Sequence, residues 1–145
     1  MDATIRAGEK SVDPPVGCDA RLVYIGVLRT PWVERGDCPR QGDEQGPECR
    51  IELDPRWLEA LTGIEAWPRL QVLYWMHEAR RDLVLQWPHG AAAPSGTFAL
   101  RSPVRPNPIA SSIVTLVRRE PSGLIVRGLD CLDGTPLLDL KPHWG

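Results

Sequence analysis

The stretch Arg101-Ser-Pro-Val-Arg-Pro-Asn-Pro-Ile109 places three prolines within six residues of a 145-residue chain. A proline fixes its own φ angle and has no backbone N–H to donate, so the stretch is expected to be rigid and extended. Two arginines and one asparagine lie on it. Rigidity combined with planar hydrogen-bonding groups suits the wall of a ligand site, and the alternative is a proline-rich turn between strands.

Segments rich in β-favouring residues recur on both sides of this stretch. They span residues 22–28, 48–53, 69–77, 96–100, 111–118, 124–129 and 137–140. Pro121-Ser122-Gly123 supplies the turn of a hairpin, and Gly26 marks a bulge or a close backbone approach. Asp54 and Pro55 predict the start of a helix that ends at Gly63.

Short strands without a regular strand–helix alternation predict a mostly β fold, either a barrel or a sandwich. We expect a small β-barrel of about six or seven strands with one or two short helices. The length fits a single domain. Residues 1–19 are polar and contain Pro14 and Pro15, so they are expected to form a flexible tail before a domain over residues 20–145.

The charge of the chain excludes binding to nucleic acid by charge alone. The formal net charge is −2, and residues 96–145 carry six basic and four acidic side chains. Domains that bind nucleic acid through charge are usually plainly basic, so such binding here would need shape, a partner subunit or a small basic patch.

Cysteine spacing and hydropathy exclude several other classes. The cysteines, at positions 18, 38, 49 and 131, form no C-x-x-C pair, which predicts neither a zinc site nor a disulfide framework. No apolar run approaches the ~20 residues of a membrane span, and the first residues lack the apolar core of a signal peptide. We therefore expect a cytoplasmic protein without metal or membrane.

Polar clusters lie at expected strand ends or in long loops. They are Pro39-Arg40-Gln41, Met76-His77, Arg101 through Asn107, and Asp133-Gly134-Thr135. Strand ends of a barrel gather at one rim, where pockets form. Each cluster also has a simpler interpretation, such as a tight turn at Asp133 or a solvated Arg40. The residues alone therefore predict a pocket without a named chemistry.

In their order, these segments resemble the TsaA-like (TrmO) tRNA methyltransferase family over roughly residues 21 to 143. The resemblance rests on Ile25-Gly26-Val27 with Thr30-Pro31, Pro39-Arg40-Gln41, Met76-His77, Arg101 through Ile109, and Leu129 through Pro136 followed by Asp139 through Pro142. It implies a β-barrel unlike the Rossmann-like methyltransferases, S-adenosylmethionine as cofactor, and a homodimer. It also implies methylation of the exocyclic nitrogen of threonylcarbamoyl-adenosine next to the tRNA anticodon.

The resemblance also implies a set of site residues. The cofactor-binding residues are Pro39, Arg40, Gln41, Met76, His77, Arg101, Ser111, Leu132, Asp133, Gly134 and Thr135. The acceptor nitrogen is poorly nucleophilic until its proton leaves, so His77 or Asp133 is a candidate base. For the substrate side we expect Arg105, Asn107 and Lys141, with the alternative that Arg105 and Asn107 only brace the proline stretch.

Two alternative functions stay open at this point. Many bacterial members of the family carry an additional C-terminal domain that the sequence to Gly145 does not contain, so a barrel that binds the same cofactor and methylates another substrate is one alternative. The other is a non-catalytic ligand-binding module in which the proline stretch forms a docking edge.

Overall fold

The computed structural model describes residues 5–13, 17 and 19–145, and the chain divides into two compact units. Unit 1 comprises the described part of Met1–Arg21 together with Met76–Ile109, and unit 2 comprises Leu22–Trp75 and Ala110–Gly145. This division leaves the expected single domain over residues 20–145 as a prediction. Part of the expected tail, residues 1–4, 14–16 and 18, lies outside the described residues.

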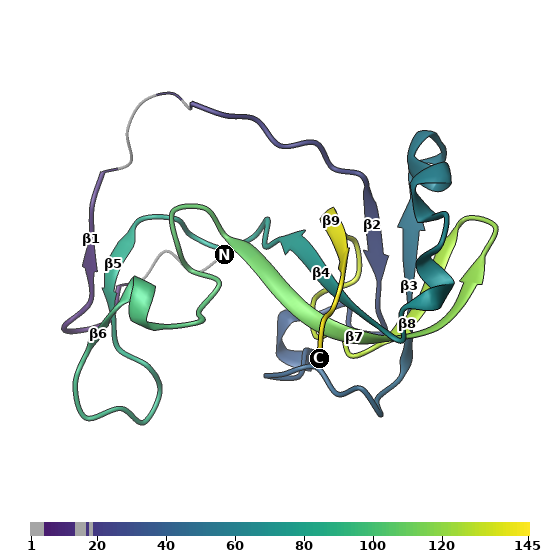
Figure 1. Cartoon of the computed structure of the whole chain (residues 1–145). Helices are drawn as coiled ribbons and strands as arrows, with labels where there is room; N and C mark the ends of the chain where they lie inside the picture. Colours follow the sequence, from purple (N-terminus) through teal and green to yellow (C-terminus); the bar gives the residue numbers. More distant parts are fainter. Residues whose placement is uncertain (1–4, 14–16, 18) are drawn as a thin grey trace. The chain divides into compact units, whose positions relative to one another are not determined.

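Unit 2 is built on a closed barrel with the strand order β2-β3-β8-β7-β4-β9 (Figure 1). The strands are β2 Gly26–Arg29, β3 Glu48–Leu53, β4 Arg69–Trp75, β7 Ile109–Glu120, β8 Gly123–Arg127 and β9 Thr135–Pro142. The alternation of β3 buries Cys49, Ile51 and Leu53, because successive side chains of a strand point to opposite faces. The predicted small β-barrel is confirmed.

Strand spacing in the barrel depends on two glycines. A Cβ atom at Gly26 would collide with the carbonyl oxygen of Glu52, and one at Gly123 would collide with that of Ile51. Strands β2 and β8 therefore approach β3 from both sides at a distance that only glycine permits. The predicted close approach at Gly26 is confirmed, and the expected hairpin turn joins β7 to β8.

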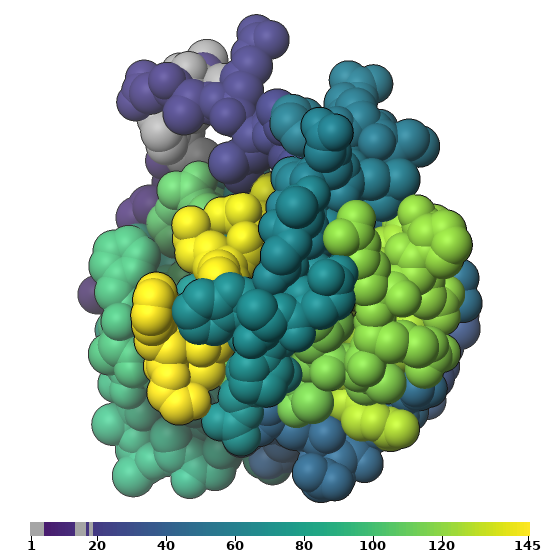
Figure 2. All heavy atoms as spheres, turned by 45° about the vertical axis from the view of Figure 1, so that its right-hand side comes forward, coloured from purple at the N-terminus to yellow at the C-terminus, as the bar shows by residue number. Residues whose placement is uncertain are grey.

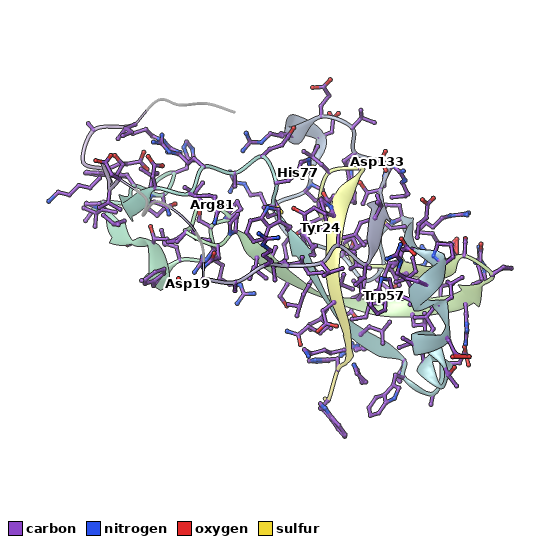
Figure 3. The ribbon with its side chains drawn as sticks, turned by 90° about the horizontal axis from the view of Figure 1, so that it is seen from above. Asp19, Tyr24, Trp57, His77, Arg81 and Asp133 are labelled. Carbon is purple, nitrogen blue, oxygen red and sulfur yellow. The ribbon has the colours of Figure 1, made fainter. Side chains whose placement is uncertain are left out.

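The helices of unit 2 are short 3-10 helices, namely η1 Arg35–Asp37, η2 Pro55–Leu61 and η3 Ile64–Ala66. As predicted, η2 follows Asp54, whose carboxylate accepts a hydrogen bond from the Arg56 N–H at 3.0 Å. Leu61 is buried, and Trp57 lies on the exposed side (Figure 3). In Figure 2 the η2–η3 segment runs alongside the light-green β7–β8 hairpin, where Arg119 pairs with Glu65 at 3.1 Å.

Unit 1 contains a three-stranded sheet in the order β1-β5-β6 (Figure 1). Its elements are β1 Lys10–Ser11, β5 Leu83–Gln86, β6 Ser95–Gly96 and the 3-10 helix η4 Thr97–Ala99. The Gln86 amide donates to the Thr97 hydroxyl at 2.9 Å and to the Val104 carbonyl at 2.7 Å. This buried side chain therefore ties the proline stretch to the sheet.

Three local predictions were wrong. The expected strand at residues 96–100 is the helix η4, in which the Thr97 hydroxyl donates to the Leu83 carbonyl. The expected long loop at residues 78–95 contains β5. The expected strand at residues 22–28 begins only at Gly26, and the three apolar side chains at 22–24 are each more than half exposed. Within the described chain no helix has the length and hydropathy needed to span a membrane.

Candidate functional site

The predicted site residues fall in both units. Unit 2 holds Pro39, Arg40, Gln41, Ser111, Leu132, Asp133, Gly134, Thr135 and Lys141. Unit 1 holds Met76, His77, Arg101, Arg105 and Asn107.

Backbone hydrogen bonds fix the turn of residues 129–135, which enters β9. The Asp133 N–H donates to the Trp32 carbonyl at 2.7 Å, and the Gly134 N–H donates to the Leu28 carbonyl at 2.9 Å. Gly134 has a φ of +85°, a conformation that glycine adopts without strain. The turn is therefore held rigidly against the end of β2.

Side chains in this turn reinforce its shape. Asp133 (Figure 3) accepts a hydrogen bond from the Thr30 N–H at 3.1 Å, and its second carboxylate oxygen lies 3.7 Å from an Arg29 guanidinium nitrogen. The hydroxyl of the buried Thr135 donates to the Leu132 carbonyl at 2.6 Å. Both oxygens of Asp133, one of the two candidate bases, therefore already have partners.

The segment of residues 39–41 ends against the start of the same turn. A Cβ atom at Gly42 would collide with the carbonyl oxygen of Gly128, so the two backbones touch. Two residues further along, Glu44 accepts a hydrogen bond from the Thr115 hydroxyl at 2.9 Å. The Gly42–Gly128 contact places the end of the 39–41 segment beside the residue that precedes the turn of residues 129–135.

Three of the predicted cofactor-binding side chains make no hydrogen bond or ion pair with the described residues. Arg40, Gln41 and Arg101 are exposed, and no hydrogen bond or ion pair from the described part of the chain engages their polar ends. By contrast, Arg118 pairs with both Glu48 and Glu120. Uncommitted guanidinium groups are available to bind an anionic group of a ligand.

Ser111 and Lys141 are engaged within the barrel. The Ser111 hydroxyl accepts a hydrogen bond from the Gln71 amide at 3.0 Å, and the Lys141 ammonium lies 3.1 Å from the Asp139 carboxylate. Lys141 and Asp139 are both about half exposed, so their pairing is easily exchanged for another partner.

Met76 and His77 begin the part of unit 1 that follows β4. The Met76 N–H donates to the Pro108 carbonyl at 2.8 Å, and the Met76 carbonyl accepts from the Ala79 N–H at 3.0 Å. His77 (Figure 3) is exposed on the turn that results. Its cluster therefore contacts the end of the proline stretch through backbone.

Two arginines brace the proline stretch. Arg105 donates from one guanidinium nitrogen to the carbonyls of Leu100 and Ser102, at 3.1 and 2.8 Å. Arg81 (Figure 3) donates to the Pro106 carbonyl at 2.6 Å. Proline nitrogens cannot donate, so these side chains supply the hydrogen bonds that the stretch itself lacks.

The bracing contacts favour the alternative interpretation of the substrate-side candidates. The Arg105 guanidinium faces backbone oxygens, and the Asn107 side-chain oxygen lies 3.5 Å from an Arg81 guanidinium nitrogen. A role of Arg105 and Asn107 in binding substrate stays a prediction.

Sequence reasoning missed one polar network in the barrel. The Tyr74 hydroxyl lies 2.7 Å from the Ser112 hydroxyl and donates to an Asp130 carboxylate oxygen at 2.9 Å. Tyr74 is only 2% exposed. Burial, and then the charge of Asp130, raise the pKa of the phenol. The available signal was a single tyrosine in an apolar strand, because a buried phenol needs a hydrogen-bond partner.

The described thiols are in their protonated form at neutral pH. Burial raises the pKa of Cys131 to about 12 and that of Cys49 to about 11. The pKa of Cys38 is raised by burial first and then by the charge of Asp130. No group of three or more His, Cys, Asp or Glu side chains among the residues described is arranged to hold a metal ion.

A groove of about 560 Å³ lies elsewhere in unit 2. It runs between η3 and the end of β7, and Trp67, Leu116 and Arg119 are among its lining residues. None of its lining residues belongs to the predicted site. Its polar side chains are paired with each other, since Arg119 binds Glu65. The fixed turn and the 39–41 segment therefore form the candidate site.

Comparisons with known proteins show which proteins the chain resembles. The family described as tRNA-methyltransferase O N-terminal domain matches residues 27–145. A Rhizobium radiobacter protein named probable S-adenosyl-L-methionine-binding protein VirR is 52% identical over 138 residues, which cover 95% of this chain and 79% of the relative. A probable S-adenosyl-L-methionine-binding protein of Methanothermobacter thermautotrophicus is 39% identical, with 87% of this chain and 91% of the relative covered.

Longer relatives match over part of their length. The Escherichia coli tRNA (adenine(37)-N6)-methyltransferase is 35% identical over 130 residues, which cover 82% of this chain and 55% of the relative. A crystal structure of TrmO from Pseudomonas aeruginosa superposes with a TM-score of 0.72 at 33% identity, covering 88% of this chain and 55% of that chain. This chain therefore spans about half the length of these two relatives.

Proposed function

The chain belongs to the tRNA-methyltransferase O N-terminal domain family, and from this membership we propose that it uses S-adenosylmethionine to methylate threonylcarbamoyl-adenosine in tRNA. The methylated atom is the exocyclic nitrogen of the base next to the anticodon. Two relatives are named as S-adenosylmethionine-binding proteins, which supports the proposed cofactor. Another is named as a tRNA adenine methyltransferase, which supports the proposed substrate.

The observation that carries the proposal is the contact between Gly42 and the carbonyl of Gly128. It joins the segment of residues 39–41 to the turn of residues 129–135, two clusters that are far apart in sequence. Joined in this way, they offer backbone groups of a rigid turn together with the uncommitted side chains of Arg40 and Gln41.

The residues present fit the chemistry of the methyl donor. S-adenosylmethionine supplies a methyl group on a sulfonium, and it carries a carboxylate and hydrogen-bonding adenine and ribose groups. Arg40 suits the carboxylate, and the Gln41 amide suits the polar edges of the nucleoside. Arg101 of unit 1 is a second uncommitted guanidinium with the same chemistry.

The chain's own part in the reaction is positioning. Methyl transfer is an in-line displacement that needs the reacting atoms in contact and water excluded. A turn fixed by hydrogen bonds to Leu28 and Trp32 holds its place without rearranging when a ligand binds, which is the condition for such positioning.

A labelled-methyl assay tests the proposal. The protein is incubated with methyl-labelled S-adenosylmethionine and with tRNA that carries or lacks the threonylcarbamoyl group. We expect label only in the modified tRNA. Transfer to neither tRNA, with the donor bound, would favour a barrel that methylates another acceptor. Failure to bind the donor would leave the non-catalytic ligand-binding module.

The predicted homodimer and the cytoplasmic location stay predictions. Sedimentation equilibrium of the purified chain measures the first, and localisation of the native protein in fractionated cells measures the second. A dimer mass twice the 16.1 kDa of the chain is the expected result of the first experiment.

A further inference from the structure

A hydrogen-bonded network inside unit 2 ends at the carboxylate of Asp130, which lies in the turn of residues 129–135 but is not one of the predicted site residues. Tyr74 on β4 lies between Ser112 on β7 and Asp130 in the turn after β8. The phenol has one proton, which it donates to Asp130, so the Ser112 hydroxyl donates to the phenol oxygen. The order of donation is therefore Ser112 to Tyr74 to Asp130.

Asp130 is held in place and remains available on one side. One carboxylate oxygen accepts from Tyr74, and no partner from the described residues engages the other. The residue is half-buried. Its neighbour Cys131 is fixed because its carbonyl accepts from the Thr30 hydroxyl at 2.8 Å. Asp133 differs, since both of its oxygens have partners.

The carboxylate belongs to the same turn as the predicted residues Leu132 to Thr135. It precedes Leu132 by two residues, and its charge contributes to the raised pKa of Cys38, the residue before the 39–41 segment. The titratable groups whose pKa its charge raises are Tyr74 from the barrel, Cys38 from the loop and Cys131 from its own turn. All three keep their protons near pH 7, because their pKa values are raised.

We propose that the Asp130 carboxylate takes up the proton that leaves the acceptor nitrogen during methyl transfer, and that Tyr74 is the residue that positions it. This inference rests on the proposed function. The nitrogen lone pair forms the new nitrogen–carbon bond, and the electron pair of the broken carbon–sulfur bond stays on the donor sulfur. The nitrogen proton passes to Asp130 and then to water.

A carboxylate is strong enough for this step. The nitrogen of a urea-like group becomes highly acidic as it gains a methyl group and positive charge, so its proton is transferred readily to a weak base already in place. Position matters more than basicity here, and the buried Tyr74 hydroxyl fixes the position.

The test measures methyl transfer to threonylcarbamoyl-tRNA, donor affinity by equilibrium dialysis, and thermal unfolding, for three variants. Asp130→Asn keeps an oxygen that accepts from Tyr74 and removes the base. We expect kcat to fall about 100-fold or more with donor affinity and melting temperature unchanged. The decrease of kcat at acidic pH that a carboxylate base produces in the wild type is expected to be absent in this variant.

Tyr74→Phe removes only the hydrogen bond to the carboxylate, so we expect a smaller decrease in kcat, about 10-fold, with the acidic decrease still present. Glu59→Gln, at an exposed carboxylate on η2, is the matched control and is expected to behave as the wild type. The Tyr74→Phe result decides the question even if Asp130→Asn does not fold.

Two results would overturn the inference alone, given an active wild-type protein. One is wild-type kcat in Asp130→Asn. The other is a loss of rate in a folded variant that follows a loss of donor affinity. If Asp130→Asn does not fold, wild-type kcat in Tyr74→Phe overturns the inference. A wild-type protein that binds the donor and methylates no tRNA would instead overturn the proposed function and the inference with it.

Discussion

Replacing Gly42 by alanine separates the two halves of the candidate site by adding one methyl group. The new Cβ atom would occupy the position of the Gly128 carbonyl oxygen, so the backbones of residues 42 and 128 must move apart. The φ of Gly42 is not positive, so alanine adopts this backbone conformation without strain and the effect is steric only.

The size of the effect follows from the overlap. The obstacle is backbone rather than the end of a flexible side chain, so it cannot rotate away. Overpacking of this kind costs ~1–3 kcal/mol. If the 39–41 segment moves away to relieve this overpacking, binding of the methyl donor must restore its position at the same cost in free energy. The affinity for the donor is then about 5- to 150-fold lower.

Calorimetric titration with S-adenosylmethionine measures this loss. Gly36→Ala is the matched control, because it makes the same change in the same loop at a position where a Cβ atom meets nothing within 4 Å. We expect wild-type affinity for Gly36→Ala and reduced affinity for Gly42→Ala, with both proteins folded. Equal affinity of Gly42→Ala and wild type would refute the reasoning that this contact assembles the donor site.

Three further predictions concern donor binding and stability. Arg101→Ala should weaken donor binding by ~1.5–3 kcal/mol, the value of a hydrogen bond to a charged group, and unchanged affinity by calorimetry would remove Arg101 from the site. Above pH 9 the unfolded state releases the thiol proton that the folded state keeps on Cys131, with its pKa of about 12, so this thiol alone should lower the free energy of unfolding by ~1.4 kcal/mol per pH unit. Urea unfolding at pH 8 and 10.5 under reducing conditions should show a smaller fall for Cys131→Ala, and equal falls would contradict this. Asp54→Ala should lower stability by ~1 kcal/mol through loss of the bond to the Arg56 N–H, and an unchanged melting temperature would show that η2 does not depend on its cap.

The barrel was predictable because most of its strands are long enough to show their period. Strand β3 alternates over six residues, and β4 is a seven-residue run that includes Leu70 and Val72. The turn at residues 121–122 and the cap at Asp54 depend on residue types with a specific local preference. These features are determined by neighbouring residues, so the sequence shows them directly.

Unit 1 was less predictable because its elements are short and depend on distant partners. Strand β5 has four residues, and one of its partners is the polar pair Lys10–Ser11 more than 70 positions earlier. The segment Thr97–Ala99 has β-favouring residues, yet it forms a helix because Thr97 is fixed by hydrogen bonds to Leu83 and Gln86. The hydrophobic period that distinguishes a strand from a helix cannot be recognised over so few residues.

The candidate site was also predictable only in part. The resemblance identified the segments, and the structure joins two of them through Gly42 and Gly128. Neither composition nor spacing indicated that Tyr74, which looks like an ordinary core residue in its strand, carries a hydrogen bond to Asp130. Such partnerships depend on which strands are neighbours in the barrel, and they become visible only with the topology.

Equilibrium dialysis of labelled S-adenosylmethionine against the purified chain tests the central claim most directly, because it detects binding whatever its heat. We predict saturable binding that approaches one donor per chain and is competed by unlabelled donor. Label that distributes equally across the membrane at every concentration would contradict the assignment of the fixed turn and its neighbouring segment as a methyl-donor site.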